Sequence, residues 1–92
     1  MVKPVSVGVE ANRAAFQLYT SGVITSGCGT NVDHAILAVG WGNDPTYGNY
    51  WIVENSWGNT WGANGYVLIG MSSTSTAGIC GINQDVYYPL TA

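Results

Sequence analysis

The chain has 92 residues, of which 47% are apolar, 12% aromatic and only 8% charged, so part of its apolar surface is expected to meet another domain or subunit. Its net charge is −3 with only two basic residues, which excludes the electrostatic footprint of a nucleic-acid-binding protein. No apolar run approaches the roughly twenty residues that span a bilayer, so no membrane-spanning segment is predicted.

The first third of the chain alternates between short extended segments and one helix. Residues 4–9 have valine at every second position, which predicts a half-buried strand. Residues 11–20 contain good helix formers, with Ala15, Phe16 and Tyr19 at helical spacing, and predict one short amphipathic helix. Residues 23–25 then predict a short strand, and residues 26–31 a loop.

The remaining residues are dominated by strand patterns. Residues 32–41 are almost continuously apolar and predict a strand that is covered on both faces. The turn cluster at 43–49 leads into a strand that begins at Tyr50–Val53, which predicts an antiparallel hairpin. A third strand at 65–70, an exposed loop at 71–78 and an extended piece at 85–89 follow. The sequence therefore predicts one mainly β domain, a small antiparallel barrel-like rolled sheet with one short helix.

Two polar side chains are predicted near the open end of that hairpin. His34 precedes the turn cluster by nine residues and Asn55 follows it by six, so the two can be neighbours. An asparagine carbonyl can accept a hydrogen bond from one imidazole nitrogen and fix the ring, which leaves the other nitrogen for a nucleophile. A lone histidine in a small domain is more often structural, so the functional interpretation depends on the pair.

Residues 55–62 combine that asparagine with two glycines and two tryptophans. Glycine permits backbone paths that are closed to other residues, and each indole is a large rigid surface that must cover something. We expect Trp57 and Trp61 to cover Asn55. The alternative is plain core packing.

The two cysteines, Cys28 and Cys80, are 52 residues apart. A disulfide between them is the preferred interpretation, since closing such a loop would contribute roughly 4 kcal/mol in the chain-entropy model. The alternative is two buried free thiols. An oxidised pair would place the parent protein in a secreted, lysosomal or vacuolar compartment. The first residues lack the charged and apolar regions of a signal peptide, so any targeting segment is expected outside this chain.

The chain then has a candidate base and its orienting residue but no nucleophile. A disulfide would occupy both cysteines, and Ser56 is expected to face away from its neighbour Asn55. One histidine and two widely spaced cysteines also lack the ligand spacing of a zinc site, so neither a metal nor a cofactor is predicted.

Asp33-His34-Ala35, followed by Asn55-Ser56-Trp57-Gly58, Trp61-Gly62 and Gly65-Tyr66, resembles the papain-like cysteine proteases. The resemblance covers nearly all of this chain but only the carboxy-terminal half of the family's chain. It implies that residues 1–92 are the carboxy-terminal domain of a cysteine endopeptidase that acts on peptide substrates. The amino-terminal domain, which supplies the nucleophilic cysteine in the family, would be the missing partner.

The same resemblance assigns roles to individual residues. His34 would be the catalytic base and acid, Asn55 its orienting residue, Trp57 the shield of their hydrogen bond, and Trp61 the wall on the leaving-group side. Cys28 and Cys80 match the positions of a disulfide in many members. The isolated chain would be inactive, and it would self-associate through the face that bears His34 and the two tryptophans.

The resemblance also implies a pocket for the substrate side chain two residues before the scissile bond, formed by Gly8, Val32, Ala35 and Asp85, with Asp33 as a further substrate-binding residue. An acidic Asp85 at its floor would favour arginine or lysine; the alternative is that this side chain points to solvent. The sequence departs from the family at Glu54, where lysine is common. A binding module that uses the tryptophans as a ligand platform, without chemistry, is the competing hypothesis.

Overall fold

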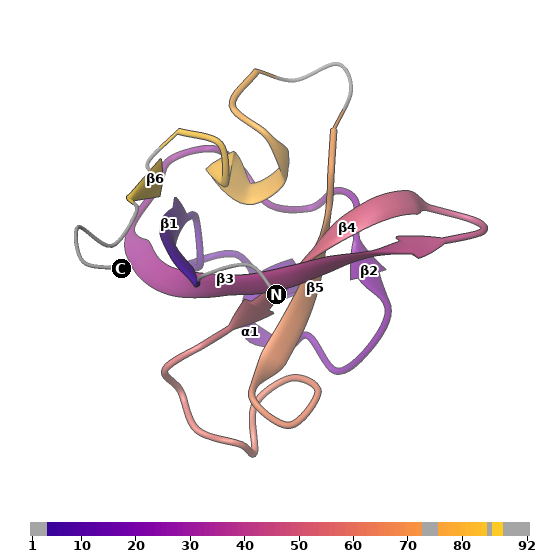
Figure 1. The fold of residues 1–92 in the computed structure, drawn as a ribbon. Coiled ribbons are helices and arrows are strands. Elements are labelled where there is room, and N and C mark those ends of the chain that lie inside the picture. The colour runs from indigo at the N-terminus through magenta and orange to yellow at the C-terminus, as the bar shows by residue number, and fades with distance from the viewer. Residues whose placement is uncertain (1–3, 73–75, 85, 88–92) are drawn as a thin grey trace.

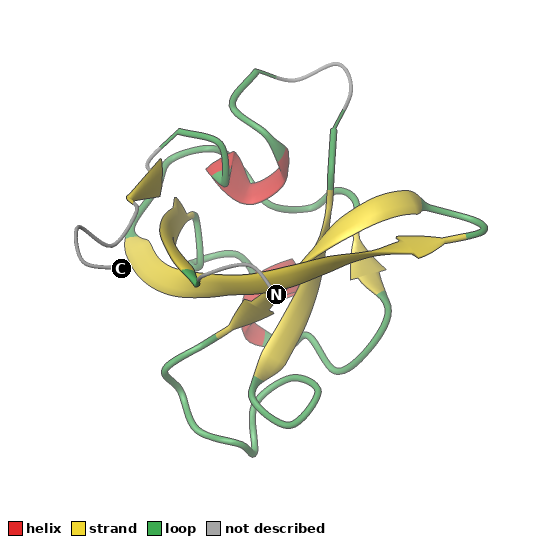
Figure 2. Cartoon of the chain, in the orientation of Figure 1, coloured by secondary structure: helices red, strands yellow, loops and turns green. Residues whose placement is uncertain are grey.

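The structure is a computed structural model that describes residues 4–72, 76–84 and 86–87. Its elements in chain order are β1 (Val5–Val9), α1 (Ala14–Gln17), β2 (Val23–Ile24), β3 (His34–Asp44), β4 (Gly48–Glu54), β5 (Tyr66–Gly70), η1 (Ile79–Gly81) and β6 (Val86–Tyr87). Within these residues six strands form one sheet in the order β2-β5-β4-β3-β1-β6 (Figure 1). The prediction of a mainly β fold with one short α-helix is confirmed (Figure 2). None of the described helices is long and apolar enough to cross a membrane.

Neighbouring strands are antiparallel with one exception. The predicted hairpin is formed by β3 and β4, and β5 joins β4 as the third strand of the same sheet. The edge strand β2 instead runs parallel to β5, so the expectation of a purely antiparallel sheet is wrong at that edge. A parallel pair needs a long crossover connection, and the 41 residues between β2 and β5 contain the whole β3–β4 hairpin.

The core lies on one face of the central strands. Residues directly opposite one another across adjacent strands share a face, and Val7 pairs with Ile36 while Val53 pairs with Val67. All four are buried. The helix α1 adds Phe16 to the same core, and the segment around η1 adds buried side chains of its own.

The helix is shorter than predicted, covering residues 14–17 rather than 11–20. The residues before it are held by another part of the chain: the backbone N–H of Ala11 donates to Asp33 Oδ1 at 2.8 Å. Arg13, the N-cap, is therefore still extended. After the helix, the hydroxyl of Tyr19 donates to the Gly22 carbonyl at 2.6 Å, which turns the chain toward β2.

The strand β3 is covered on one face only, so the expectation of two covered faces is wrong. Leu37 is 41% exposed and Trp41 60%. The strand also ends at Asp44, three residues later than predicted, so the connection to β4 is shortened to residues 45–47. Asp44 Oδ1 accepts the backbone N–H groups of Thr46 and Tyr47, an arrangement that closes a tight turn.

A disulfide and a buried carboxylate fix the segment that leads into β3. Cys28 and Cys80 are bonded as predicted. The carboxylate of Glu10, which is buried, accepts the backbone N–H of Asn31 and the Arg13 guanidinium, both at 3.0 Å. The hydrogen bond from Asn31, and then that from Arg13, hold the pKa of Glu10 below its ordinary value of 4.5.

Candidate active site

The hairpin brings His34 and Asn55 together as the sequence predicted. His34 is the first residue of β3 and Asn55 directly follows β4, and the two strands are in register at Leu37 and Glu54. The distance from His34 Nε2 to Asn55 Oδ1 is 2.8 Å. Asn55 is 7% exposed, so this contact is largely protected from water.

The backbone at Ser56 decides which ring nitrogen carries the proton. Its N–H donates to the same Asn55 Oδ1, at 2.7 Å. A backbone N–H can only donate, so the side-chain atom that it meets must be the oxygen of the amide and not the nitrogen. His34 Nε2 must then be the donor in its own contact. Nδ1 is left as the nitrogen without a hydrogen-bond partner among the described residues, available for chemistry.

Sequence reasoning considered Ser56 only as a nucleophile and missed this role. No sequence signal could reveal it, because every residue except proline carries a backbone N–H.

The indole of Trp57 stacks on the imidazole of His34, with ring centroids 5.0 Å apart and an interplanar angle of 27°. This contact restrains the orientation of the imidazole ring. Trp57 itself is half-exposed. Its edge contacts come from Phe16 at 5.5 Å and Trp61 at 5.3 Å.

The helix α1 supports both indoles. Phe16 is fully buried and stacks on Trp61 with ring centroids 5.1 Å apart. The indole N–H of Trp61 donates to the Gln17 carbonyl at 3.0 Å, which satisfies one of the free carbonyls at the helix end. Sequence reasoning placed Phe16 on the helix but gave it no part in the site. Its helical spacing marked a buried face without revealing what that face contacts.

Tyr19 completes the cluster, with its ring 5.9 Å from that of Trp61. Burial raises its pKa above the ordinary value of 10, against the opposing hydrogen bond from the backbone N–H of Leu68. The phenol therefore stays a neutral donor at physiological pH.

The loop of residues 55–62, which carries Trp57 and Trp61, needs its two glycines because both adopt a positive φ. Gly62 has a φ of 62°, and a Cβ at that position would lie 2.6 Å from the carbonyl oxygen of Tyr66. Gly58 has a φ of 89° with open space around it. The loop closes through the backbone N–H of Asn55, which donates to the Gly65 carbonyl at 3.0 Å. The asparagine is therefore fixed at both its backbone and its side chain.

A cavity of about 270 Å³ lies beside His34. Four residues that the sequence predicted for substrate binding contribute to its lining, namely Gly8, Val32, Asp33 and Ala35. Gly8 and Ala35 are directly opposite each other on β1 and β3. The carboxylate of Asp33 already accepts the Ala11 N–H, so it also holds the backbone between β1 and α1. The fifth predicted residue, Asp85, lies outside the described residues.

The arrangement provides a base, an orienting amide and an aromatic support. It provides no thiol, because both cysteines of the chain are in the disulfide. No group of three His, Cys, Asp or Glu side chains that could hold a metal occurs in the described part of the chain. Proton transfer at His34 Nδ1 is thus the chemistry that these residues can perform.

Residues 1–90 match the model of the papain family of cysteine proteases. The chain is 49% identical over 89 residues to Cysteine protease 1 of Oryza sativa subsp. japonica, covering 96% of this chain and 18% of that protein. It is 47% identical to Germination-specific cysteine protease 1 of Arabidopsis thaliana, covering 96% and 23%. The fold resembles a solved bromelain protease from Ananas comosus, described in complex with the E64 inhibitor, with a TM-score of 0.86 and 49% identity. That alignment covers 94% of this chain and 40% of the bromelain chain.

Proposed function

The chain belongs to the papain family of cysteine proteases, and we propose that residues 1–92 form the carboxy-terminal domain of an endopeptidase that hydrolyses peptide bonds. The observation that carries the proposal is the 2.8 Å contact between His34 Nε2 and Asn55 Oδ1, which leaves Nδ1 without a partner. The chain spans about a fifth of the length of the relatives it matches, so the activity belongs to a larger protein.

In the proposed reaction, His34 Nδ1 takes the proton of a cysteine thiol that the missing amino-terminal domain supplies. The thiolate attacks the carbonyl carbon of the peptide, and the C–N bond breaks as the imidazolium returns the proton to the leaving amine. Water then attacks the thioester: Nδ1 takes its proton, and the cysteine leaves again as the thiolate. Asn55 keeps Nε2 protonated throughout and holds the ring plane, and it gains or loses no proton itself.

The surrounding residues fit supporting roles. Trp57 holds the imidazole face and reduces the access of water to the His34–Asn55 hydrogen bond, while Trp61 forms the wall on the leaving-group side. Gly8, Val32, Asp33 and Ala35 receive the substrate side chain two residues before the scissile bond. In this proposal Asp85 adds a negative charge to that pocket, which would favour arginine or lysine.

The remaining expectations concern the parent protein. The disulfide supports a secreted, lysosomal or vacuolar location, since such bonds persist in oxidising compartments. The isolated chain is expected to hydrolyse no peptide. It is also expected to self-associate at high concentration through the face that bears His34, Ala35 and the two tryptophans.

Fluorogenic-peptide turnover after mixing this chain with the cysteine-bearing portion of its protease tests the proposal. Either component alone should stay at background, and the mixture should be active. His34→Gln should reduce that activity by at least about 100-fold, the scale of general acid–base catalysis, and Asn55→Ala by a smaller factor. Asp44→Asn at the hairpin turn is the matched control and should change nothing. Activity that survives His34→Gln refutes the proposal, and a mixture that associates without turnover favours the binding-module alternative.

A further inference from the structure

The outer part of the β3–β4 hairpin, residues 41–51, projects from the rest of the sheet (Figure 1). We call it the hairpin arm. It carries the two most exposed aromatic side chains of the described residues, Trp41 at 60% and Tyr47 at 54%. Neither has a part in the candidate active site. Single exposed apolar side chains are ordinary, so the meaning of this exposure depends on the residues beside it.

Two indoles and two amides share one face of the hairpin arm. Trp41 is directly opposite Trp51, and Asn43 is directly opposite Asn49. Residues two apart on a strand, and residues directly opposite on neighbouring strands, lie on the same face of a sheet. Trp51 is half-buried and packs against the core, whereas Trp41 is exposed. These four residues therefore form an apolar surface that ends in a pair of amides, which we call the platform.

The two amides are held in one arrangement and keep hydrogen-bonding capacity. Asn43 Nδ2 donates to Asn49 Oδ1 at 2.9 Å. The carbonyl oxygen of Asn43 and the amide nitrogen of Asn49 have no partner among the described residues, so the pair offers an acceptor and a donor. The adjoining turn is fixed, because Asp44 Oδ1 accepts the backbone N–H groups of Thr46 and Tyr47. A site that is fixed before binding loses less entropy when a ligand arrives.

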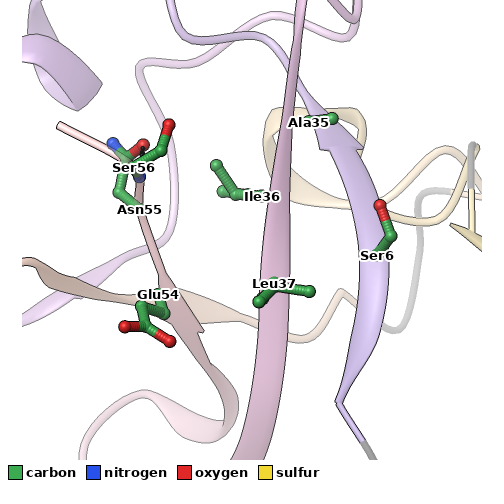
Figure 3. A pocket seen from close by; sticks show the side chains of 7 residues that line it. All are labelled: Ser6, Ala35, Ile36, Leu37, Glu54, Asn55 and Ser56. Atoms are coloured by element: carbon green, nitrogen blue, oxygen red, sulfur yellow. Dashed lines mark hydrogen bonds between the residues drawn. The ribbon is translucent and has the colours of Figure 1, made fainter.

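The other face of the hairpin arm is occupied by the arm itself. Tyr50 lies over Gly42, which is directly opposite, and a Cβ at Gly42 would lie 2.6 Å from the phenol oxygen. Trp51 shares its face with the buried Val53, whereas Glu54 lies on the opposite face. The platform is therefore on the other side of the sheet from the cavity in Figure 3, to which Glu54 contributes.

We propose that the platform binds a neutral saccharide, with one pyranose ring stacked on Trp41 and its hydroxyl groups hydrogen-bonded to Asn43 and Asn49. A pyranose has an apolar C–H face that suits an indole, and its hydroxyl groups both donate and accept. Residues 41–51 contain no lysine, arginine or histidine, and their one carboxylate, Asp44, is engaged in the turn. A neutral ligand therefore fits this face better than a phosphate or a charged peptide.

A second copy of this chain is a poorer occupant than a saccharide. A stable protein complex buries about 800 Å² on each partner, whereas the platform offers one exposed indole and two amides. A saccharide would also leave the candidate active site open, since Trp41 is seven residues, or roughly 20 Å of strand, from His34. This inference goes beyond the proposed function and does not depend on it.

An NMR titration of the isotope-labelled chain with cellohexaose, at millimolar concentrations, tests the proposal. The indole N–H signal of Trp41 and the side-chain amide signals of Asn43 and Asn49 should shift together, while the ring signals of His34 should not. Trp41→Ala should weaken binding about two- to tenfold, the range of a single aromatic contact, and Trp41→Tyr should restore part of it. Asn49→Ala should weaken binding by a similar factor. Added salt should leave the affinity unchanged, since no charge pair forms.

Leu18→Ala is the matched control, because it removes a side chain that is 77% exposed outside the hairpin arm. It should leave the binding of cellohexaose unchanged. Unchanged binding by Trp41→Ala, no shift at the platform, or shifts confined to His34 and Gly8 each overturns the proposal. Signals of Trp41 that broaden with chain concentration and do not respond to cellohexaose overturn it as well, since a second copy then occupies the platform. None of these measurements needs catalysis, so their failure leaves the proposed function untouched.

Discussion

Breaking the Cys28–Cys80 bond should remove a large part of the stability of this domain. The bond closes a loop with a sequence separation of 52. In the chain-entropy model such a cross-link lowers the entropy of the unfolded chain by about 14 cal/mol/K, which corresponds to about 4 kcal/mol at 25 °C. A domain of this length has a total free energy of unfolding of about 5–14 kcal/mol. Reduction should therefore remove between about a third and most of it.

Urea unfolding followed by tryptophan fluorescence, with and without reductant, measures this difference. The Cys28→Ala/Cys80→Ala variant should have the same free energy of unfolding as the reduced protein, and the reductant should not change it. A loss below about 1 kcal/mol would show that the loop closure contributes little and would refute the entropic estimate. An intact mass that does not change on reduction would show that no bond exists in solution.

Reduction of the disulfide also tests whether this bond affects the geometry of the site in addition to the stability of the domain. After reduction, the segment before His34 is still tied by the backbone N–H of Asn31 to Glu10 and by that of Asp33 to the Val9 carbonyl, both at 3.0 Å. The reduced chain that remains folded should therefore keep the ring signals of His34 in an NMR spectrum. Altered ring signals would mean that the disulfide itself positions the base.

Three further predictions concern the supports of the site. Phe16→Leu should lower the free energy of unfolding by about 1–3 kcal/mol, since it removes two aromatic contacts. It should also weaken the near-ultraviolet circular dichroism of the indoles, and an unchanged spectrum would contradict the supporting role of Phe16. Because hydrogen bonds, first from the Asn31 amide, lower the pKa of Glu10, its stabilisation is present above pH 4.5 and is lost as the pH falls through the lowered pKa. Glu10→Gln should flatten that part of the pH dependence of urea unfolding, and a variant with the wild-type dependence would refute the assignment. Gly62→Ala should lower the melting temperature more than Gly58→Ala, because both strain a positive φ but only the first places its Cβ against a carbonyl oxygen; equal losses would contradict this.

The sheet could be predicted where the pattern was local. Alternating valines indicated β1, and the turn cluster with flanking apolar runs indicated the β3–β4 hairpin. The coverage of β3 could not be predicted, because a continuous apolar run does not reveal which face another element covers. The helix was predicted too long because its propensity extends over residues 11–20, whereas the hydrogen bond from Ala11 to Asp33 overrides it.

For the candidate site, the pairing of His34 with Asn55 could be predicted because both residues flank a single hairpin, whose register follows from its turn. Trp57 and Trp61 are expected to cover Asn55; the indole of Trp57 stacks on His34, and the cover of Asn55 stays a prediction. The contributions of Phe16 and of the Ser56 backbone could not be predicted. Phe16 contributes through a contact between segments that are far apart in the sequence. Ser56 contributes through its backbone N–H, a group that nearly every residue type has.

The site combines contacts within the β3–β4 hairpin with contacts between distant elements, and the two kinds should respond differently to changes in α1. The His34–Asn55 pair needs only the β3–β4 hairpin and the turn at Ser56, so it should survive changes in α1 that leave the sheet intact. The stacking of Trp57 on His34 depends in addition on Phe16, which is 41 positions before Trp57 and belongs to another element. A loosened α1 should therefore release the indole while the imidazole keeps its tautomer. The orientation of the base is a property of the hairpin, and its aromatic cover is a property of the whole domain.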